Sequence, residues 1–260
     1  MPVDPELRSR LAGLELPRHL AVIPDGNRRW ATERDMDAMD GHRAGYEVAR
    51  TLSKFCREIG IHTVTIWAFS TENWHRSKEE VGALMRLYGQ WIEELLPEAI
   101  EEQVRVVHLG RKAGWPVGIE RSSIPSGFGD GLPSQLVGAI EEIEEKTRYF
   151  DSNVINLAIN YGGADEIDRS IKKMYAHSLE TGAQIDELDI VNFLDTSGQP
   201  HPEPDLVWRT SGEFRSSGFL PVQSSYSELV FTPKYFPQLQ EADVVEAVEE
   251  YSARARRFGR

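Results

Sequence analysis

The feature that most constrains this fold is a regular alternation of short apolar runs and longer amphipathic segments. Runs rich in β-branched and aromatic residues predict strands at 20–23, 63–69, 104–109, 154–159, 206–208 and 229–231. Helical spacing predicts helices within 41–59, from 77 to about 95, over 136–143, after 163, over 190–194 and within 242–258. This alternation favours a mostly parallel sheet flanked by helices. We expect one α/β domain over residues 1–260, with 1–17 as an N-terminal arm.

Local signals support two of these helices. Val48, Leu52, Phe55 and Ile59 share one helical face, and the helix is expected to end at Gly60. Ser77 and Glu80 have the spacing of a capping box at the start of the next helix. The one cysteine of the chain, Cys56, lies on the first apolar stripe. We expect it to be a buried thiol with neither a disulfide nor a metal partner.

Charge and hydropathy exclude several classes of protein. Lys and Arg total 29 against 42 Asp and Glu, a net charge of −13 that argues against a nucleic-acid binder. Phosphate binding by so acidic a chain must depend on a local cluster of arginines. Residues 1–17 lack the apolar segment of a signal peptide, and no apolar run approaches the roughly 20 residues of a membrane span. We therefore expect a soluble, cytoplasmic protein.

A polar segment follows the first predicted strand, at 24–30. Ligands of open α/β sheets bind beyond the carboxyl ends of the strands, so this is a candidate site. Gly26 allows close approach of the backbone, and Arg28 and Arg29 are donors suited to phosphate. Asp25 would then be an acid within a phosphate site, which suits Mg²⁺ shared with substrate phosphates. The alternative is an ordinary Asp-Gly turn with solvated arginines.

Three further segments have the same placement. Residues 69–76 combine hydroxyl, amide, imidazole and guanidinium groups able to orient a diphosphate and move a proton, or they form a polar loop before Ser77. Residues 209–219 carry two arginines among serines and glycines, the composition of an anion cradle or of a solvated loop. Glu228, beside the last apolar run, is either a second metal ligand or merely exposed.

Motifs of other chemistries are missing. The sequence lacks the Gly-rich phosphate loops, the Gly-x-Ser-x-Gly nucleophile elbow, the Asp-Asp-x-x-Asp metal motif and His-x-x-x-His zinc spacing. A phosphate-ester hydrolase would also need a nucleophile or a water-activating pair, and none is evident.

Taken together and in order, these segments resemble the cis-prenyltransferase family, which includes undecaprenyl diphosphate synthases. The likeness runs from about residue 16 to 259. It comprises Asp-Gly-Asn-x-Arg-Trp-Ala at 25–31, Gly-His at 41–42 with Gly45, Phe-Ser-x-Glu-Asn-Trp-x-Arg at 69–76, Asn-Tyr-Gly-Gly at 160–163, Arg-Thr-Ser-Gly-Glu at 209–213, Tyr-Ser-Glu-Leu at 226–229 and Arg-Arg-Phe-Gly at 256–259.

The resemblance implies a homodimeric α/β enzyme that condenses isopentenyl diphosphate with an allylic diphosphate, farnesyl or geranylgeranyl, into a medium- or long-chain cis-polyprenyl diphosphate. It implies Mg²⁺ as cofactor, a hydrophobic tunnel, and at most peripheral membrane contact through the lipid product. Ala68, Leu84, Tyr88 and Val104 are expected in the tunnel wall.

The resemblance also implies a role for each matching residue. Asp25 would bind Mg²⁺ with help from Glu228. Catalysis would rest on Asp25, His42, Ser70 and Asn73, of which the last three position diphosphate and assist proton removal. The implied substrate-binding set is Gly26, Asn27, Arg28, Arg29, Trp30, Phe69, Trp74, Arg76, Arg209, Arg215, Ser217, Arg257 and Gly259, the last two in a tail that reaches the partner's active site.

The sequence departs from the family pattern where it has Ala38 and Ala164 in place of arginines, and Gly218 in place of asparagine. These departures bear on substrate choice and product length. Two alternatives stay open: a family member that makes a short or irregular prenyl diphosphate, and a non-catalytic partner subunit.

Overall fold

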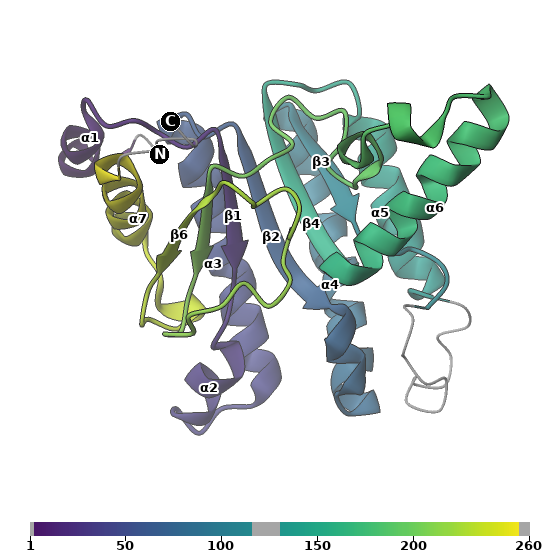
Figure 1. The fold of residues 1–260 in the computed structure, drawn as a ribbon. Helices are drawn as coiled ribbons and strands as arrows, with labels where there is room; N and C mark the ends of the chain where they lie inside the picture. The colour runs from purple at the N-terminus through teal and green to yellow at the C-terminus, as the bar shows by residue number, and fades with distance from the viewer. Residues whose placement is uncertain (1–2, 116–130, 255–260) are drawn as a thin grey trace.

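Six parallel strands form the centre of the molecule. The computed structural model describes residues 3–115 and 131–254, and the strands lie in the order β3-β4-β2-β1-β5-β6 (Figure 1). Their bounds are β1 His19–Ile23, β2 Thr63–Ser70, β3 Val104–Leu109, β4 Asn153–Tyr161, β5 Leu206–Arg209 and β6 Glu228–Phe231. Every adjacent pair is parallel, so all six carboxyl ends share one edge of the sheet. The predicted α/β class is confirmed.

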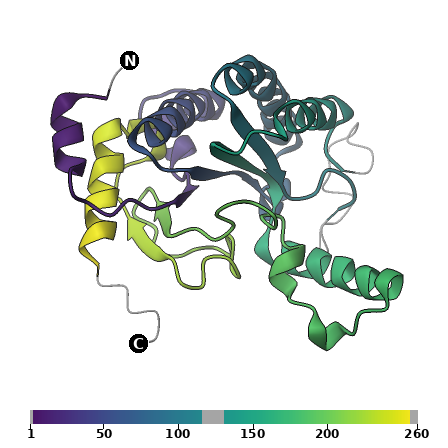
Figure 2. The same cartoon turned by 90° about the horizontal axis from the view of Figure 1, so that it is seen from above.

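Helices cover both faces of this sheet. The helices α3 (Ala38–Ile59), α4 (Lys78–Glu101) and α5 (Ser134–Thr147) lie in a row on one face, and α6 (Gly163–Thr181) lies on the other (Figure 2). The helix α7 (Glu241–Ala253) packs near β6. Short elements connect them: α2 Asn27–Thr32, η1 Thr71–His75, η3 Ile185–Glu187, η4 Ile190–Phe193 and η5 Phe236–Gln238.

The N-terminal arm contains a helix that the sequence pattern did not predict, α1 (Pro5–Leu11). Asp4 caps its first turn, and Pro5 occupies the first helical position, where no backbone donor is needed. Arg10 then forms a two-pronged ion pair with Glu249 of α7, at 2.9 and 2.7 Å. The arm is thus packed against the C-terminal helix.

The apolar core explains why the strands appear in the sequence as continuous hydrophobic runs. One cluster joins β1, β2, β5 and β6 to α3 and α7, and a second joins β2, β3 and β4 to α4 and α5. Cys56 lies in the first cluster and is 1% exposed, as expected, and burial raises the pKa of its thiol to about 12. Within the described ranges, no helix is both long and apolar enough to span a membrane.

Most predicted boundaries agree with the structure to within a few residues. The C-terminal helix is an exception, because it ends at Ala253 rather than near residue 258. The predicted capping box at α4 is half formed: Ser77 accepts from the Glu80 amide at 3.2 Å, but the Glu80 carboxylate pairs with Arg76. The predicted loop at 122–132 lies almost wholly outside the described residues.

Candidate active site

Three neighbouring strands deliver the polar residues of the site. Asp25 follows β1, while Ser70 and Arg209 end β2 and β5, and β1 pairs with both of those strands. Thr210 fixes the β1–β5 junction, because its hydroxyl accepts from the Asp25 amide at 2.8 Å and donates to the Asp25 carbonyl at 2.7 Å. Segments 185 residues apart in sequence are therefore held together where the strands end.

The Asp25 carboxylate is surrounded by donors. One oxygen accepts from the Gly26 amide at 2.7 Å and from Arg29 at 3.2 Å, and the other accepts from Arg209 at 2.9 Å. Burial by itself would raise the pKa of Asp25, but the hydrogen bond and positive charge of Arg209 outweigh it and hold the pKa below its usual value. Asp25 is consequently an anion at neutral pH.

Arg209 is the most enclosed cation of the site. Its side chain is 6% exposed, and it also donates to the Arg215 carbonyl at 2.6 Å and to the Ser217 hydroxyl at 2.8 Å. These contacts fix the planar guanidinium in one orientation, as recognition of a phosphate requires. Arg215 takes part through its backbone, since its own side chain is exposed and pairs with Glu213.

Close packing of two helices brings Asn27 and His42 together. A Cβ atom on Gly41 would lie 2.1 Å from the Asn27 carbonyl oxygen, and one on Gly45 would lie 2.4 Å from the Asn27 side-chain oxygen. Glycine at both positions therefore lets α3 contact α2 directly. This contact places the first turn of α3 beside the turn that carries Asp25.

His42 is half-buried and neutral. Burial lowers the pKa of its imidazole to about 4, and the charges of Arg76 and Arg28 act in the same direction. Among the described residues, no hydrogen-bond partner lies within reach of its buried Nε2. A neutral ring with an unused nitrogen can accept a proton or a hydrogen bond from a ligand.

The turn after β2 supplies Ser70, Asn73 and Arg76. The Asn73 side chain accepts from the Ser70 amide at 3.1 Å, which closes a capping box on η1. Arg76 pairs with Glu80 at 3.2 Å, so a carboxylate of α4 orients it. Local hydrogen bonds thus fix this polar turn before any ligand binds.

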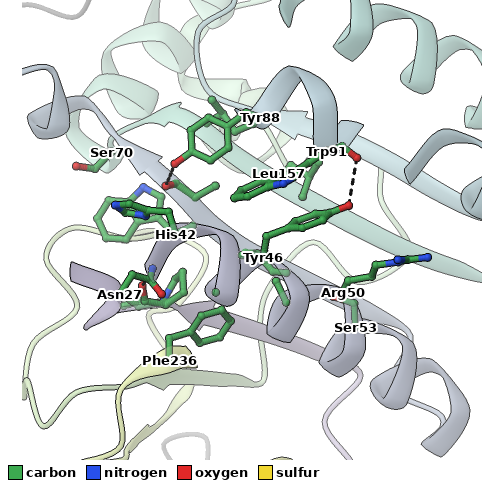
Figure 3. Close-up of a pocket in the computed structure, with 18 of the residues that line it drawn as sticks. Asn27, His42, Tyr46, Arg50, Ser53, Ser70, Tyr88, Trp91, Leu157 and Phe236 are labelled. Carbon is green, nitrogen blue, oxygen red and sulfur yellow. Dashed lines mark hydrogen bonds between the residues drawn. The ribbon is translucent and has the colours of Figure 1, made fainter. Parts of the chain in front are cut away.

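These residues line a single cavity of about 440 Å³, which Figure 3 shows in close-up. Its polar end is formed by Asp25, Asn27, His42, Ser70, Asn73, Arg76, Arg209 and Ser217. The cavity continues between α3, α4 and the sheet along an apolar wall that includes Ile66, Ala68, Tyr88, Ile92, Leu95, Ile155, Leu157 and Ile159. Leu84 and Val104, expected in that wall, are instead buried in the core.

Other predicted residues support the cavity from outside. Gly26, whose positive φ of 96° suits glycine, and Arg29 contact Asp25 without lining the cavity. Phe69 and Trp74 are core residues, 1% and 0% exposed, and neither lines the cavity. Trp74 donates to Asn160 at 2.8 Å and thereby braces the turn.

Two more of the expected contacts lie at the periphery. Arg28 is within 3.8 Å of Glu80 on the outer side of the site, and its side chain is 57% exposed. Trp30 stacks under Arg34, with 4.6 Å between the guanidinium carbon and the ring centroid. Neither residue lines the cavity. Arg257 and Gly259 lie outside the described residues.

Within one chain, the structure does not bring Glu228 near Asp25. Glu228 begins β6 and pairs with Leu206, whereas Arg209 pairs with Phe231. At about 3.3 Å per residue, Glu228 lies about 10 Å back along the sheet from the site. Its carboxylate accepts from Arg254 at 3.0 Å. The separation follows from strand register, which the local sequence around Glu228 does not encode.

The donor set at Asp25 fits a magnesium ion shared with substrate. Within the described part of the chain, no three His, Cys, Asp or Glu side chains gather into a metal cage. Mg²⁺ does not require one, because it is usually held by one or two carboxylates, water and substrate phosphates. Asp25 is an ionised carboxylate at the cavity mouth, next to arginines that suit phosphate.

Sequence reasoning missed the residues at the far end of the cavity. Tyr46, Arg50, Ser53 and Arg57 of α3 line it together with Trp91 and Glu98 of α4. The α3 residues follow His42 at helical spacing, which was the available signal. They were overlooked because polar residues on a helix are ordinarily assigned to its solvent face.

At the carboxyl ends of a parallel sheet, a cluster of groups suited to phosphate opens into an apolar channel. This is the site expected of an isoprenyl transferase. The comparisons agree: the family model described as "Putative undecaprenyl diphosphate synthase" matches residues 23–259. An isoprenyl transferase of Aquifex aeolicus is 39% identical over 247 residues, covering 95% of this chain and 97% of that protein. The geranylgeranyl-diphosphate-specific tritrans,polycis-undecaprenyl-diphosphate synthase of Pyrococcus abyssi is 38% identical over 250 residues, covering 94% and 88%.

A solved structure gives the same result. Lavandulyl diphosphate synthase from Lavandula x intermedia, in complex with dimethylallyl diphosphate, superposes with a TM-score of 0.83 at 32% identity, covering 94% of this chain and 99% of that one. This chain belongs to the cis-prenyltransferase family, as its motifs predicted.

Proposed function

We propose that this prenyltransferase uses Mg²⁺ to condense isopentenyl diphosphate with an allylic diphosphate, farnesyl or geranylgeranyl. One observation carries the proposal: the cluster of Asp25, Arg209 and His42 opens directly into an apolar channel. Such a cavity suits a substrate with a charged head and a hydrocarbon tail. The Pyrococcus relative named above supports geranylgeranyl diphosphate as one primer to test.

The reaction forms a carbon–carbon bond between C4 of isopentenyl diphosphate and C1 of the allylic substrate. The allylic C1–O bond breaks, diphosphate leaves, and C2 of the isopentenyl unit loses a proton. Negative charge therefore grows on the departing diphosphate, and the donors Asn27 and Arg76, which line the polar end of the cavity, stabilise it. When bound, Mg²⁺ would neutralise part of that charge.

The other residues bind, orient and exclude water. Arg209 and Ser217 hold the isopentenyl diphosphate, while Asn73 and Ser70 orient its head group. Neutral His42, with a free nitrogen facing no protein partner among the described residues, assists proton removal. The apolar wall shields the allylic cation from water, and each buried CH₂ of the growing chain contributes about 0.8 kcal/mol.

Incubation of the purified protein with Mg²⁺, farnesyl or geranylgeranyl diphosphate and labelled isopentenyl diphosphate tests the proposal. We expect a longer, labelled prenyl diphosphate and no product when the metal is chelated. Product formation that is unchanged by chelation would reject the metal requirement. Absence of product with either primer would reject the primer assignment.

We propose a homodimer that acts in the cytoplasm and meets membranes at most peripherally, through its product. Ile171, Tyr175 and Leu179 support the dimer, because they form an apolar stripe on α6 with exposures of 48, 55 and 69%. Light scattering should give twice the chain mass, and Tyr175→Asp should give a monomer. A monomeric wild type would reject this assembly.

A further inference from the structure

One face of α3 forms a ladder along the cavity. His42, Tyr46, Arg50, Ser53 and Arg57 recur at three- or four-residue spacing, and all line it. His42 and Arg57 are fifteen residues apart, which is about 22 Å along a helix at 1.5 Å per residue. The cavity is therefore a channel that runs from the diphosphate end toward the C-terminal half of α3.

Two aromatic rings bridge the channel walls one helical turn beyond His42. Tyr46 of α3 and Trp91 of α4 stack with 4.1 Å between ring centroids and 5° between ring planes. The Tyr46 hydroxyl donates to the Trp91 carbonyl at 3.4 Å, so the ring is tethered as well as stacked (Figure 3). The pair joins the two helices across the cavity and so narrows the channel between the diphosphate end and the far end.

Ion pairs close the far end. Arg50 lies 2.8 Å and Arg57 3.6 Å from the Glu98 carboxylate, which joins α3 to α4. The side chains of Arg57 and Glu98 are 9% and 17% exposed. A hydrocarbon tail that advanced here would separate the enclosed Glu98 carboxylate from both arginines, which is strongly unfavourable, while Arg57 would keep its pair with Glu102.

The size of the channel limits the length of the tail. An extended five-carbon unit has four backbone bonds of about 1.5 Å and spans about 5 Å, so about 22 Å accommodates about four units. Volume sets a tighter limit than length. A cavity of about 150 Å³ holds the six carbons of benzene, and at that density the 440 Å³ cavity, with its diphosphate end included, holds about 18 heavy atoms.

We infer that the Tyr46–Trp91 stack and the Arg50/Arg57–Glu98 ion pairs limit the product length of this enzyme, to at most about 20 carbons. This inference rests on the proposed function, since it names the product class of the same site. It assigns the protein to the short-chain alternative rather than to long-chain synthesis. A limit of about 20 carbons requires a primer of about 15 carbons or fewer, so of the two primers named above it selects farnesyl diphosphate. Tyr46 is the determinant most accessible to mutation, because its ring occupies channel space without contacting the reacting atoms.

Product analysis of Tyr46→Ala tests the inference. We expect the wild type to stop at or before about 20 carbons and Tyr46→Ala to add at least one five-carbon unit. Tyr46→Phe, which retains the stacked ring, should give the wild-type product. Tyr149→Ala, which removes an 80% exposed ring outside the channel, is the matched control. A folded Tyr46→Ala with unchanged products, or wild-type products beyond about 30 carbons, would overturn the inference.

Binding of non-reactive thiolodiphosphate analogues gives a readout that does not require turnover. Calorimetry on the wild type should show affinity rising with tail length up to at most about 20 carbons and falling about tenfold or more at 30 carbons, and Tyr46→Ala should remove that fall. Affinity that keeps rising in the wild type would overturn the inference. An enzyme that binds this series as expected but transfers no prenyl group would contradict the proposed function alone.

Discussion

Arg209 donates to the Asp25 carboxylate across 2.9 Å and so joins the carboxyl ends of β5 and β1. This bond keeps Asp25 ionised although it is half-buried. It also keeps the guanidinium at the cavity mouth in the absence of an anion. The pair is therefore preformed, and in the proposed function its carboxylate would hold the metal and its cation would bind diphosphate.

Asp25→Asn removes the charge while preserving the shape of the side chain. We expect turnover to fall by about 10²- to 10³-fold, the usual cost of losing one preorganised electrostatic partner. The melting temperature should fall modestly, because the amide oxygen still accepts from Arg209 but no longer balances its charge. Asp40→Asn is the matched control, since Asp40 pairs with Arg43 on the surface of α3 and does not line the cavity. Retention of most activity by Asp25→Asn would refute the metal role.

Arg209→Lys retains the charge but loses the planar fork. Three acceptors, on Asp25, Arg215 and Ser217, then compete for one ammonium group. We expect the KM for isopentenyl diphosphate to rise about tenfold or more, with a smaller change for the allylic substrate. Steady-state kinetics with each substrate varied in turn provides the measurement. A rise confined to the allylic substrate would show that the two diphosphate subsites are reversed.

The place of the site was predictable because parallel strands end together. Asp25, Ser70 and Arg209 each follow a recognisable apolar run. Because the carboxyl ends of parallel strands lie at one edge of the sheet, where ligands bind, these residues could be predicted to share that edge. Trp74 was harder to place, because an aromatic residue within a polar motif reads equally as a ligand contact or as a core residue. The structure resolves this by the hydrogen bond from Trp74 to Asn160, a partner 86 residues away.

Strand register and helix pairing, which depend on distant segments, account for the features of the site that the sequence did not predict. Glu228 is a plausible metal ligand by composition, and only the pairing of β6 with β5 shows that it lies at the other end of the strands. Tyr46 and Trp91 meet because α3 packs beside α4, which neither helix encodes locally. The chemical groups within one segment could therefore be predicted from the sequence, whereas the contacts between distant segments required the structure.

Buried histidines predict loss of stability in mild acid. Burial lowers the pKa of His19 to about 3 and of His108 to about 4, below the usual value of 6.5. Between pH 6.5 and 4.5 the unfolded chain binds protons that the native state does not. The unfolding free energy should therefore fall as the pH is lowered, by up to about 1.4 kcal/mol per pH unit for each histidine. Glu166, whose pKa burial raises, opposes this trend.

Urea unfolding at several pH values measures the effect. His19→Gln should reduce the slope of the unfolding free energy against pH, because glutamine does not titrate. Glutamine can still form a hydrogen bond with Thr65, the 2.7 Å partner of His19. His177→Gln is a control on α6 outside the three core clusters. A slope that His19→Gln leaves unchanged would contradict this account.

Gly41 tests whether contact between α2 and α3 builds the active site. An alanine there would place Cβ 2.1 Å from the Asn27 carbonyl oxygen, which is backbone and cannot rotate away. We expect Gly41→Ala to lower the unfolding free energy by about 1–3 kcal/mol and to weaken diphosphate binding by displacing Asn27. Gly138→Ala is the matched control, because nothing lies within 4 Å of its added Cβ in α5, and it should stabilise the protein by about 0.5–1 kcal/mol. Equal effects of the two substitutions would mean that helix propensity, rather than the α2–α3 contact, governs this position.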